Sequence, residues 1–312
     1  MKIYNGYNIT GVRNPVVTMG SFDGVHRGHV MLLSRLRERA VVLGGESTVV
    51  TFNPHPRLLV GGFSSRINLL TSHDEKLHLL EQTGIDNTVV LEFDDELRSM
   101  EACLFVEKVL AGRLGMKHMV VGFNHRFGRG GKGDFTEISA CASRVGFGLE
   151  RLGSLVSGET AISSTLIRET ISEGRLTEAN GMLGYDYFVT GTIVEGRQLG
   201  RSIGFPTANI SPVFPNKLLP GDGVYAVTVR FNGDEYGGMA NIGRRPTVNT
   251  GGEPKSVEVH IFDFEEFIYD KQVTLTFRFR LRDEMHFPSV EALRDQLHED
   301  RLAAERLLGS VD

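Results

Sequence analysis

The first half of the chain alternates short β-branched runs with stretches in which apolar residues recur at helical spacing. Such alternation is typical of parallel βαβ units. The predicted elements are, in chain order, strand 15–19, helix 30–43, strand 48–52, helix 74–82, strand 88–91, helix 102–114 and strand 118–121. The pattern therefore predicts an α/β domain whose sheet is doubly wound.

After about residue 185, strands follow one another without helices between them, and turn residues separate them. The predicted strands are 187–194, 224–231, 237–242, 257–264 and 272–281. This spacing predicts a compact antiparallel barrel or sandwich. A final helical pattern over 289–308 places Leu293, Leu297, Ala304 and Leu308 on one face, so we expect this helix to pack against the strands.

A short helical stretch over 164–183 separates the two patterns and ends at Gly184. The length of 312 residues also fits two domains better than one. We therefore predict a first domain over 1–184 and a second over 185–312.

Composition narrows the class of protein without identifying its function. The chain is 40% hydrophobic and 23% charged, as in an ordinary folded protein. There are 34 Lys and Arg against 39 Asp and Glu, and the net charge of −5 gives no support to a nucleic acid or an anionic membrane as main partner. A local basic site stays possible.

Two cysteines, Cys103 and Cys141, cannot make a disulfide framework or a four-ligand zinc site, and their scarcity fits a reducing compartment. No run of about 18 apolar residues is present, and the first residues lack the apolar stretch of a signal peptide. We expect a cytoplasmic protein with no disulfide, neither exported nor embedded in a membrane.

The most informative segment is G-S-F-D-G-V-H-R-G-H, residues 20–29, between the first predicted strand and helix. His26 and His29 are three apart, so in a first helical turn they share a face and present two imidazoles and a helix dipole to an anion. A surface pair or a metal pair would show the same spacing, although no third ligand is nearby. The glycines and the position after a strand favour phosphate chemistry, and the spacing resembles the H-x-G-H signature of the nucleotidyltransferase superfamily.

Three further segments of the first half carry candidate residues. Ser164 and Thr165 open a predicted helix in which Arg168 shares a face with Thr165; they are either simple N-caps or phosphate-binding groups. The strand before Asn124 leads into a basic, glycine-rich loop, which is not a Walker A loop and is either a mobile cover over nucleotide or a plain flexible loop. The turn T-F-N-P-H-P, 51–56, looks structural by its chemistry alone.

The second half has a candidate site of its own in residues 196–209, G-R-Q-L-G-R-S-I-G-F-P-T-A-N. The oxygens of Thr207 and Asn209 suit a hard cation such as Mg²⁺, although a hairpin with a capping threonine would look similar. In S-V-E-V-H-I, alternation places Glu258 and His260 on one strand face. That face is either solvated or carries a carboxylate that takes a proton from an attacking alcohol.

Taken together, these strings resemble the prokaryotic bifunctional riboflavin kinase/FAD synthetases over nearly the whole chain. The matching segments are 20–29, 51–56, 121–128, 162–168, 191–209, 221–225, 241–247 and 257–261. The resemblance implies an α/β + β architecture, in which a Rossmann-like nucleotidyltransferase domain precedes an antiparallel β-barrel kinase domain with a terminal helix. It implies phosphorylation of riboflavin to FMN by the second domain, then adenylyl transfer from ATP to FMN by the first.

The resemblance also assigns roles by position. The groups implied in catalysis are Glu258, as base for the flavin hydroxyl, and His26, His29, Asn124 and Arg168, which stabilise charge. The ATP and phosphate groups would be Gly20, Phe22, Gly28, Ser164, Thr165, Gly200, Arg201 and Gly204. Asn53, Pro54, His55 and Pro56 would border the flavin, and Thr207 and Asn209 would bind Mg²⁺. The partners implied are riboflavin, FMN and ATP.

Three positions depart from the usual family pattern. His125 replaces an aromatic residue and could alter stacking at the synthetase site, whereas Val248 and Asp270 lie where we expect packing or a turn. Two other readings stay open: an adenylyltransferase with one activity, and a flavin-binding regulatory protein. The Gly/Arg loop and Glu258 argue against the first, and the histidine pair together with Glu258 argues against the second.

Overall fold

The computed structural model describes residues 1–60, 67–123, 125–157, 160–195, 200, 203–244, 255–264 and 268–309. Its contacts divide the chain into two compact units. The first comprises Met1–Ile67 and Thr71–Ser164, and the second comprises Asn68–Leu70 and Thr165–Asp312. Among the helices that the structure describes, none is both long and apolar enough to cross a membrane.

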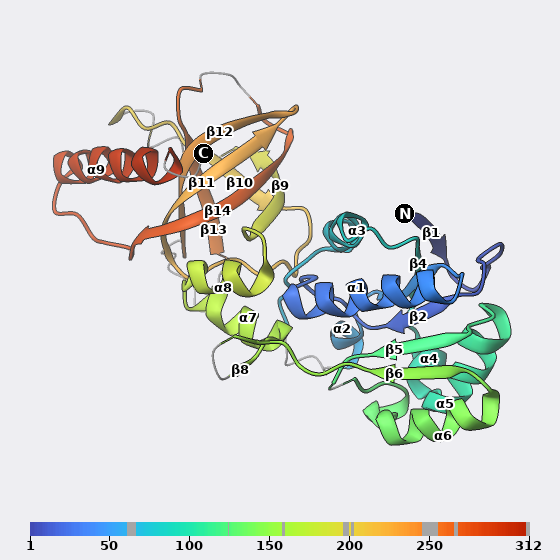
Figure 1. Ribbon diagram of the computed structural model, residues 1–312. Coiled ribbons are helices and arrows are strands. Elements are labelled where there is room, and N and C mark those ends of the chain that lie inside the picture. The colour runs from blue at the N-terminus through green and yellow to red at the C-terminus, as the bar shows by residue number, and fades with distance from the viewer. Residues whose placement is uncertain are drawn as a thin grey trace. The chain divides into compact units, whose positions relative to one another are not determined.

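The first unit is built on a six-stranded parallel sheet in the order β1-β4-β3-β2-β5-β6 (Figure 1). Its strands are β1 (Lys2–Asn5), β2 (Val16–Met19), β3 (Ser47–Asn53), β4 (Asn87–Glu92), β5 (His118–Val121) and β6 (Gly148–Arg151). The predicted doubly wound sheet is therefore confirmed. Its two edge strands, β1 and β6, escaped prediction because edge strands pair on one side only and here lack an apolar run.

The helices of this unit agree with the predicted pattern where the pattern is strong. Helix α1 (Arg27–Val42) buries Leu32, Leu33, Leu36 and Ala40, and α3 (His73–Gln82) begins with a capping box between Ser72 and Glu75. The single helix predicted over 102–114 is α5 (Ala102–Phe105) followed by a π-helical segment, η1 (Val106–Arg113). The remaining elements are α2 (Pro56–Val60), α4 (Asp95–Ser99), η2 (Arg129–Gly131), α6 (Phe135–Val145), β7 (Val156–Ser157) and β8 (Thr160–Ala161).

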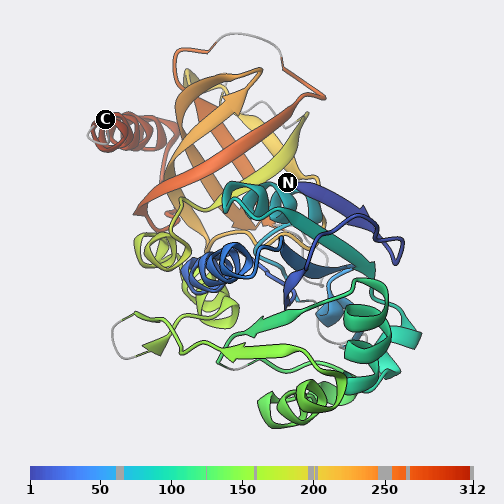
Figure 2. The same ribbon diagram turned by 45° about the vertical axis from the view of Figure 1, so that its right-hand side comes forward.

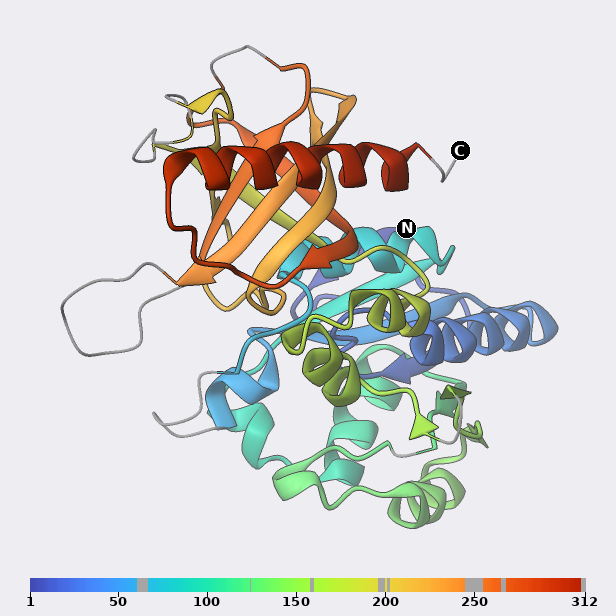
Figure 3. The same cartoon turned by 90° about the vertical axis from the view of Figure 1, so that its left-hand side faces the viewer.

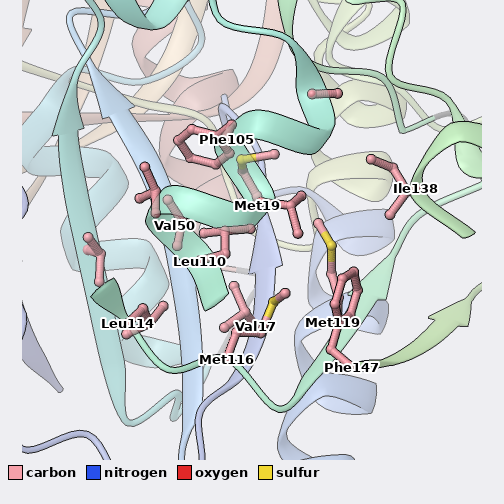
Figure 4. Close-up of a cluster of buried hydrophobic side chains, with 14 of the residues drawn as sticks. Val17, Met19, Val50, Phe105, Leu110, Leu114, Met116, Met119, Ile138 and Phe147 are labelled. Atoms are coloured by element: carbon pink, nitrogen blue, oxygen red, sulfur yellow. The ribbon is translucent and has the colours of Figure 1, made fainter. Parts of the chain in front are cut away.

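One hydrophobic core cluster of this unit lies between the sheet and the α5–η1–α6 layer. Figure 4 shows Val17, Met19 and Val50 of the strands near Phe105 and Leu110 of the helical layer. All five side chains are nearly or fully buried. Because one strand residue in two points to each face, this packing holds β2 and β3 rigidly in place beneath the loops that follow them.

Cys103 and Cys141 form a disulfide that joins α5 to α6, with their Cα atoms 5.7 Å apart. The expectation that the chain has no disulfide is therefore wrong. The two residues are separated by 38 positions, and only the packing of the two helices brings them together. Spacing along the sequence carries no signal of that contact.

The second unit contains a closed barrel in the order β10-β13-β12-β11-β14-β9, and Figure 2 shows its strands curving round one another. They are β9 (Phe188–Val194), β10 (Ala208–Pro212), β11 (Gly223–Phe231), β12 (Asp234–Arg244), β13 (Lys255–Ile261) and β14 (Gln272–Arg282). All of its strand pairs are antiparallel. Between the two alternatives left by the sequence, the structure selects the barrel.

Two helices replace the single stretch predicted over 164–183. They are α7 (Ser164–Ser172) and α8 (Leu176–Leu183), and Gly174 lies between them with a φ of +74°. A side chain at Gly174 would also meet Arg280, since its Cβ would lie 2.7 Å from Nε. Helix α8 ends at Gly184 in a left-handed conformation, so glycine supplies both breaks.

Helix α9 (Val290–Leu308) lies against the outside of the barrel (Figure 3), as predicted for the terminal helix. Ala304 packs with Phe205, Ala226, Met239 and Phe262 in a small apolar cluster. An ion pair completes the attachment: Arg282 of β14 donates to both carboxylate oxygens of Asp300, which is 4% exposed.

A short segment from the first half of the chain belongs to this second unit. Leu69 pairs with Lys217 in a parallel bridge, and its backbone exchanges hydrogen bonds with Asn216 and Leu218. The Lys217 ammonium donates to the Leu70 carbonyl at 2.6 Å and lies over the Tyr187 ring. Residues 68–70 are thus part of the barrel unit, although the sequence around them is that of the α/β domain.

Replacing Asp300 with alanine should weaken the attachment of α9, because the Arg282 guanidinium would lose its buried partner. We expect a loss of about 3 kcal/mol in the local free energy of opening, measured by hydrogen exchange of α9 and β14 peptides. Glu305→Ala is the matched control, because it removes only the exposed pair with Arg301 and should cost less than about 1 kcal/mol. Equal losses in the two variants would contradict a structural role for the Arg282–Asp300 pair.

Candidate functional site

The first candidate site lies where the strand order reverses: β3 and β4 follow β2 on one side of it, and β5 and β6 follow on the other. Strand β2 pairs with β3 on one side and with β5 on the other. In open parallel sheets, ligands bind beyond the carboxyl ends of the strands at such a point. The loop that leaves β2 at Gly20 and enters α1 at Arg27 therefore occupies the expected position.

His26 and His29 lie together at the start of α1. Their rings stack with centroids 3.7 Å apart and planes inclined by 17°. His26 is the N-cap residue, and its Nδ1 accepts the backbone N–H of His29. Phe22 covers His29 edge-on, with ring centroids 5.1 Å apart. The predicted shared face of the two histidines is therefore present.

Burial keeps both imidazoles neutral. His26 is 5% exposed, and burial lowers its pKa to about 4. The pKa of His29 falls well below its usual value, chiefly because of burial, and a positive charge on a protonated His26 would lower it further. Since the Nδ1 of His26 accepts a hydrogen bond, the neutral ring carries its proton on Nε2. The uncharged His26 ring thus offers one N–H donor to an anion.

Gly28 and Ser164 hold this loop in shape. A Cβ at Gly28 would lie 3.2 Å from two atoms of the His26 ring, so a larger residue would press on the stack. The Ser164 hydroxyl donates to the Asp23 backbone carbonyl at 2.8 Å. The Asp23 carboxylate in turn accepts from the backbone N–H of Thr71 at 3.1 Å. These contacts place Ser164 at the loop, while its phosphate-binding role stays a prediction, and they add Thr71, which the sequence did not single out.

The turn after β3 lies beside this loop. The Gly20 N–H donates to Val50 of β3, and the Thr51 hydroxyl donates to the Ser21 carbonyl at 3.4 Å. Two residues farther on, the Asn53–Pro54 peptide is cis, and α2 begins at Pro56. The structure therefore places the segment 53–56 at the same edge of the sheet as the histidine pair.

The glycine-rich segment after β5 is only partly described, and Asn124 lies outside the described residues. His125 lies near Phe127, with ring centroids 5.2 Å apart, and burial lowers its pKa to about 4. Its Nε2 is buried without a hydrogen-bond partner among the described residues. Gly128 and Gly133 pack against Ala102, which leaves no room for side chains there.

Arg168 donates to the Thr165 hydroxyl at 3.2 Å, so the predicted shared face on α7 is present. Both residues belong to the second unit, and their roles toward the histidine loop stay predictions. Of the two positions expected in packing or a turn, Asp270 does lie in a turn with a φ of +60°, and Val248 lies outside the described residues.

The barrel brings the polar candidates of the second half into one row. Glu258 of β13 lies directly opposite Asn209 of β10, and on its other side opposite Asn241 of β12. Residues directly opposite on neighbouring strands project to the same face. Asn209 is 5% exposed, so this row is sheltered from solvent at that end. Asn241 was in a segment matched by resemblance but received no role, because only strand register places it beside Glu258.

A tight turn precedes β10. The Phe205 N–H donates to the Gly200 carbonyl, and a Cβ at Gly200 would lie 2.1 Å from the Phe205 carbonyl oxygen. That hypothetical Cβ would also lie 3.6 Å from the Thr207 methyl carbon. Gly204 has a φ of +86°. Gly200, Gly204 and Thr207 are thus brought together, and Arg201 lies outside the described residues.

Among the His, Cys, Asp and Glu side chains that the structure describes, one group is compact enough to hold a metal: Cys103, Glu107 and Cys141. The two sulfurs are bonded to each other, and Arg144 donates to both Cys103 Sγ and Glu107. A guanidinium at that position disfavours a cation, so this group is not a candidate metal centre.

Comparison with known proteins decides the family. A family model described as FAD synthetase matches residues 9–166, and one described as riboflavin kinase matches residues 183–308. A curated bifunctional riboflavin kinase/FMN adenylyltransferase from Pseudomonas fluorescens is 37% identical over 295 residues, covering 95% of this chain and 93% of that protein. The chain belongs to this family. It is therefore an enzyme with riboflavin kinase and FMN adenylyltransferase activities, as the resemblance implied.

Other members of the family agree. The Haemophilus influenzae enzyme is 37% identical over 94% of both chains, and the Escherichia coli K12 enzyme is 35% identical over 94% of this chain and 93% of its own. A crystal structure described as a macrolide-efflux protein from Streptococcus pneumoniae has a TM-score of 0.88, with 28% identity over 98% of this chain and 99% of that one. The membership sets aside the alternatives of a single-activity enzyme and a regulatory flavin binder.

The pKa of His26 predicts how stability of the first unit depends on pH. In the unfolded chain His26 titrates near 6.5, but in the folded chain near 4. Above pH 6.5 His26 is neutral in both states and does not reduce the free energy of unfolding. As the pH falls from 6.5 toward 4 the unfolded state takes up the proton first, so the free energy of unfolding falls. Between pH 7 and pH 5 this costs up to about 2 kcal/mol. His26→Asn keeps a capping oxygen and should lose that much less, measured by urea unfolding; equal losses would contradict the neutral, buried assignment.

Gly200→Ala should impair riboflavin phosphorylation, because the added carbon would collide with the Phe205 carbonyl and open the turn next to Thr207. We expect a loss of about tenfold or more in kcat/KM, the size that displacement of positioned groups produces. Conversion of FMN to FAD should be unchanged in the same preparation. Gly181→Ala in α8 is the matched control, since nothing lies within 4 Å of its Cβ, and a similar loss there would contradict the steric argument.

Proposed function

We propose that the two activities divide at residue 184: residues 1–184 transfer the adenylyl group, and residues 185–312 phosphorylate riboflavin. The matched ranges of the two family models, 9–166 and 183–308, support this division. Helices α7 and α8 then belong to the first part by function, although their contacts group nearly all of their residues with the barrel unit. Riboflavin, FMN and ATP are the proposed small-molecule partners, and the cytoplasm, which holds ATP, is the proposed compartment.

In the adenylyl transfer, an FMN phosphate oxygen attacks the α-phosphorus of ATP while the bond to the β-phosphate oxygen breaks and pyrophosphate leaves. The nucleophile is already an anion, so no protein base is needed. The observation that supports this site is the stacked His26–His29 pair at the start of α1, with the His26 Nε2–H as a donor. A neutral donor and a helix N-terminus stabilise charge on the transferring phosphate.

The other proposed groups of this site follow the same logic. Gly20, Phe22 and Gly28 shape the loop around the phosphates, and Ser164, Thr165, Arg168 and Asn124 supply further donors. Asn53, Pro54, His55 and Pro56 border the flavin. Strands β2 and β3 are neighbours, and the Gly20 N–H donates a hydrogen bond to the Val50 carbonyl. This supports placing ATP and flavin side by side at this edge of the sheet.

In the kinase step, the flavin 5′-hydroxyl attacks the γ-phosphorus of ATP, and ADP leaves. We propose Glu258 as the base that takes the hydroxyl proton. Its support is the register that places Glu258 between Asn209 and Asn241, in a row where amide groups can orient the carboxylate. Gly200, Arg201 and Gly204 would close over the ATP phosphates.

Thr207 and Asn209 are the proposed ligands of Mg²⁺. A hydroxyl and an amide oxygen are hard donors. The carboxylate of Glu258, opposite Asn209 on the neighbouring strand, adds negative charge, so the residues present fit this ion. When bound, Mg²⁺ would neutralise charge on the ATP phosphates. The protein's own part is to hold Asn209 sheltered at the start of β10.

Two variants should separate the steps. Glu258→Gln keeps the side-chain size but removes the base, so FMN formation from riboflavin should slow by about 10²-fold or more. His29→Ala should slow FAD formation from FMN by a similar factor of about 10². In each variant the other step is the control, and flavins are separated by chromatography after incubation with Mg-ATP. Equal loss of both steps in either variant would contradict two separate sites.

A further inference from the structure

A buried lysine lies next to the first site and has no role in the adenylyl transfer or kinase steps proposed for the chain. Lys76 of α3 is 5% exposed, and its ammonium makes two hydrogen bonds, to the Thr51 hydroxyl at 3.1 Å and to the Phe52 carbonyl at 2.9 Å. Both acceptors are near the end of β3, immediately before Asn53. The lysine therefore binds the backbone from which the 53–56 turn departs.

This lysine is costly for the fold. Burial lowers its pKa to about 8, against the opposing charge of Asp23. No carboxylate of the described residues forms an ion pair with Lys76. An apolar side chain of similar length would fill the position without the cost of burying a charge. A function outside stability is the natural reason to keep an ammonium there.

The direction of the hydrogen bonds shows what the ammonium organises. Lys76 only donates, so the Thr51 oxygen accepts from it, and the Thr51 proton is directed to the Ser21 carbonyl. By hydrogen bonds, Lys76 reaches the loop after β2 only indirectly, through Thr51, whose hydrogen bond to Ser21 is long at 3.4 Å. The bond to Phe52 reaches the backbone next to Asn53 directly. The turn after β3 thus depends on Lys76 more than the loop after β2 does.

We infer that Lys76 is a positioning residue for FMN in the adenylyl transfer: it fixes the end of β3 so that the turn 53–56 meets the flavin in one orientation. This rests on the proposed role of that turn. In this role Lys76 acts through the Thr51 hydroxyl and the Phe52 carbonyl. The consequence is specific to one substrate, because ATP is bound by the loop on the other strand.

The test is steady-state kinetics of the full chain carrying Lys76→Met. We expect the KM for FMN to rise about tenfold or more, the size of a lost charge-assisted hydrogen bond, while kcat and the KM for ATP change less than about threefold. A purely structural role would reduce the amount of active enzyme, lowering kcat and leaving both KM values unchanged. Lys108→Met, at an exposed lysine, is the matched control and should change neither.

Riboflavin phosphorylation by the same preparation reports the amount of folded barrel unit, and the unchanged kcat and KM for ATP in FAD formation report that the α/β unit is folded. Thr51→Val tests the same contact from the other side, because it removes one acceptor of Lys76 with little change of shape. It should also raise the KM for FMN. In the double variant, the rise in the KM for FMN should be smaller than the product of the two single-variant rises. An unchanged KM for FMN in both variants, or independent effects, would overturn the inference. A wild-type chain that makes FMN but no FAD would instead overturn the proposed first site, and with it the role of Lys76.

Discussion

The pairing of β2 with β3 on one side and β5 on the other is the constraint on which the first unit depends. It brings the exits of two strands to one edge, so the loop that follows β2 and the turn that follows β3 lie together. The apolar layer of α5, η1 and α6 makes this edge rigid. Small polar contacts, from Ser164 and Thr71, then need only fix the loop locally.

The barrel solves the corresponding problem by register. Asn209, Glu258 and Asn241 come from three strands and are far apart in the sequence, yet antiparallel pairing sets them in a single row. Such a row is insensitive to loop length, because the ladder of backbone hydrogen bonds fixes it. The two units therefore reach polar sites by different means: one by strand exits and a helix start, the other by the wall of a closed sheet.

Sequence patterns predicted what periodicity and local spacing can carry. The central strands β2 to β5, the long helix α1, the barrel strands other than β10, and the face shared by His26 and His29 all follow from neighbours in the chain. What was missed depends on distant partners: the Cys103–Cys141 bond, the position of Asn241 beside Glu258, and the burial of Lys76. Short edge strands such as β1 were missed because polar residues are tolerated there.

The segment 68–70 gives the protein an unusual kind of modularity. Neither unit is one continuous stretch of chain, since the barrel unit includes Asn68–Leu70, which lie between the two stretches of the α/β unit. A single cut anywhere between the two catalytic halves therefore leaves the barrel fragment incomplete, without the Leu69 bridge and without the Leu70 carbonyl that Lys217 binds. The barrel unit thus takes part of its own hydrogen bonding from a segment that lies far from it in the sequence, inside the α/β half of the chain.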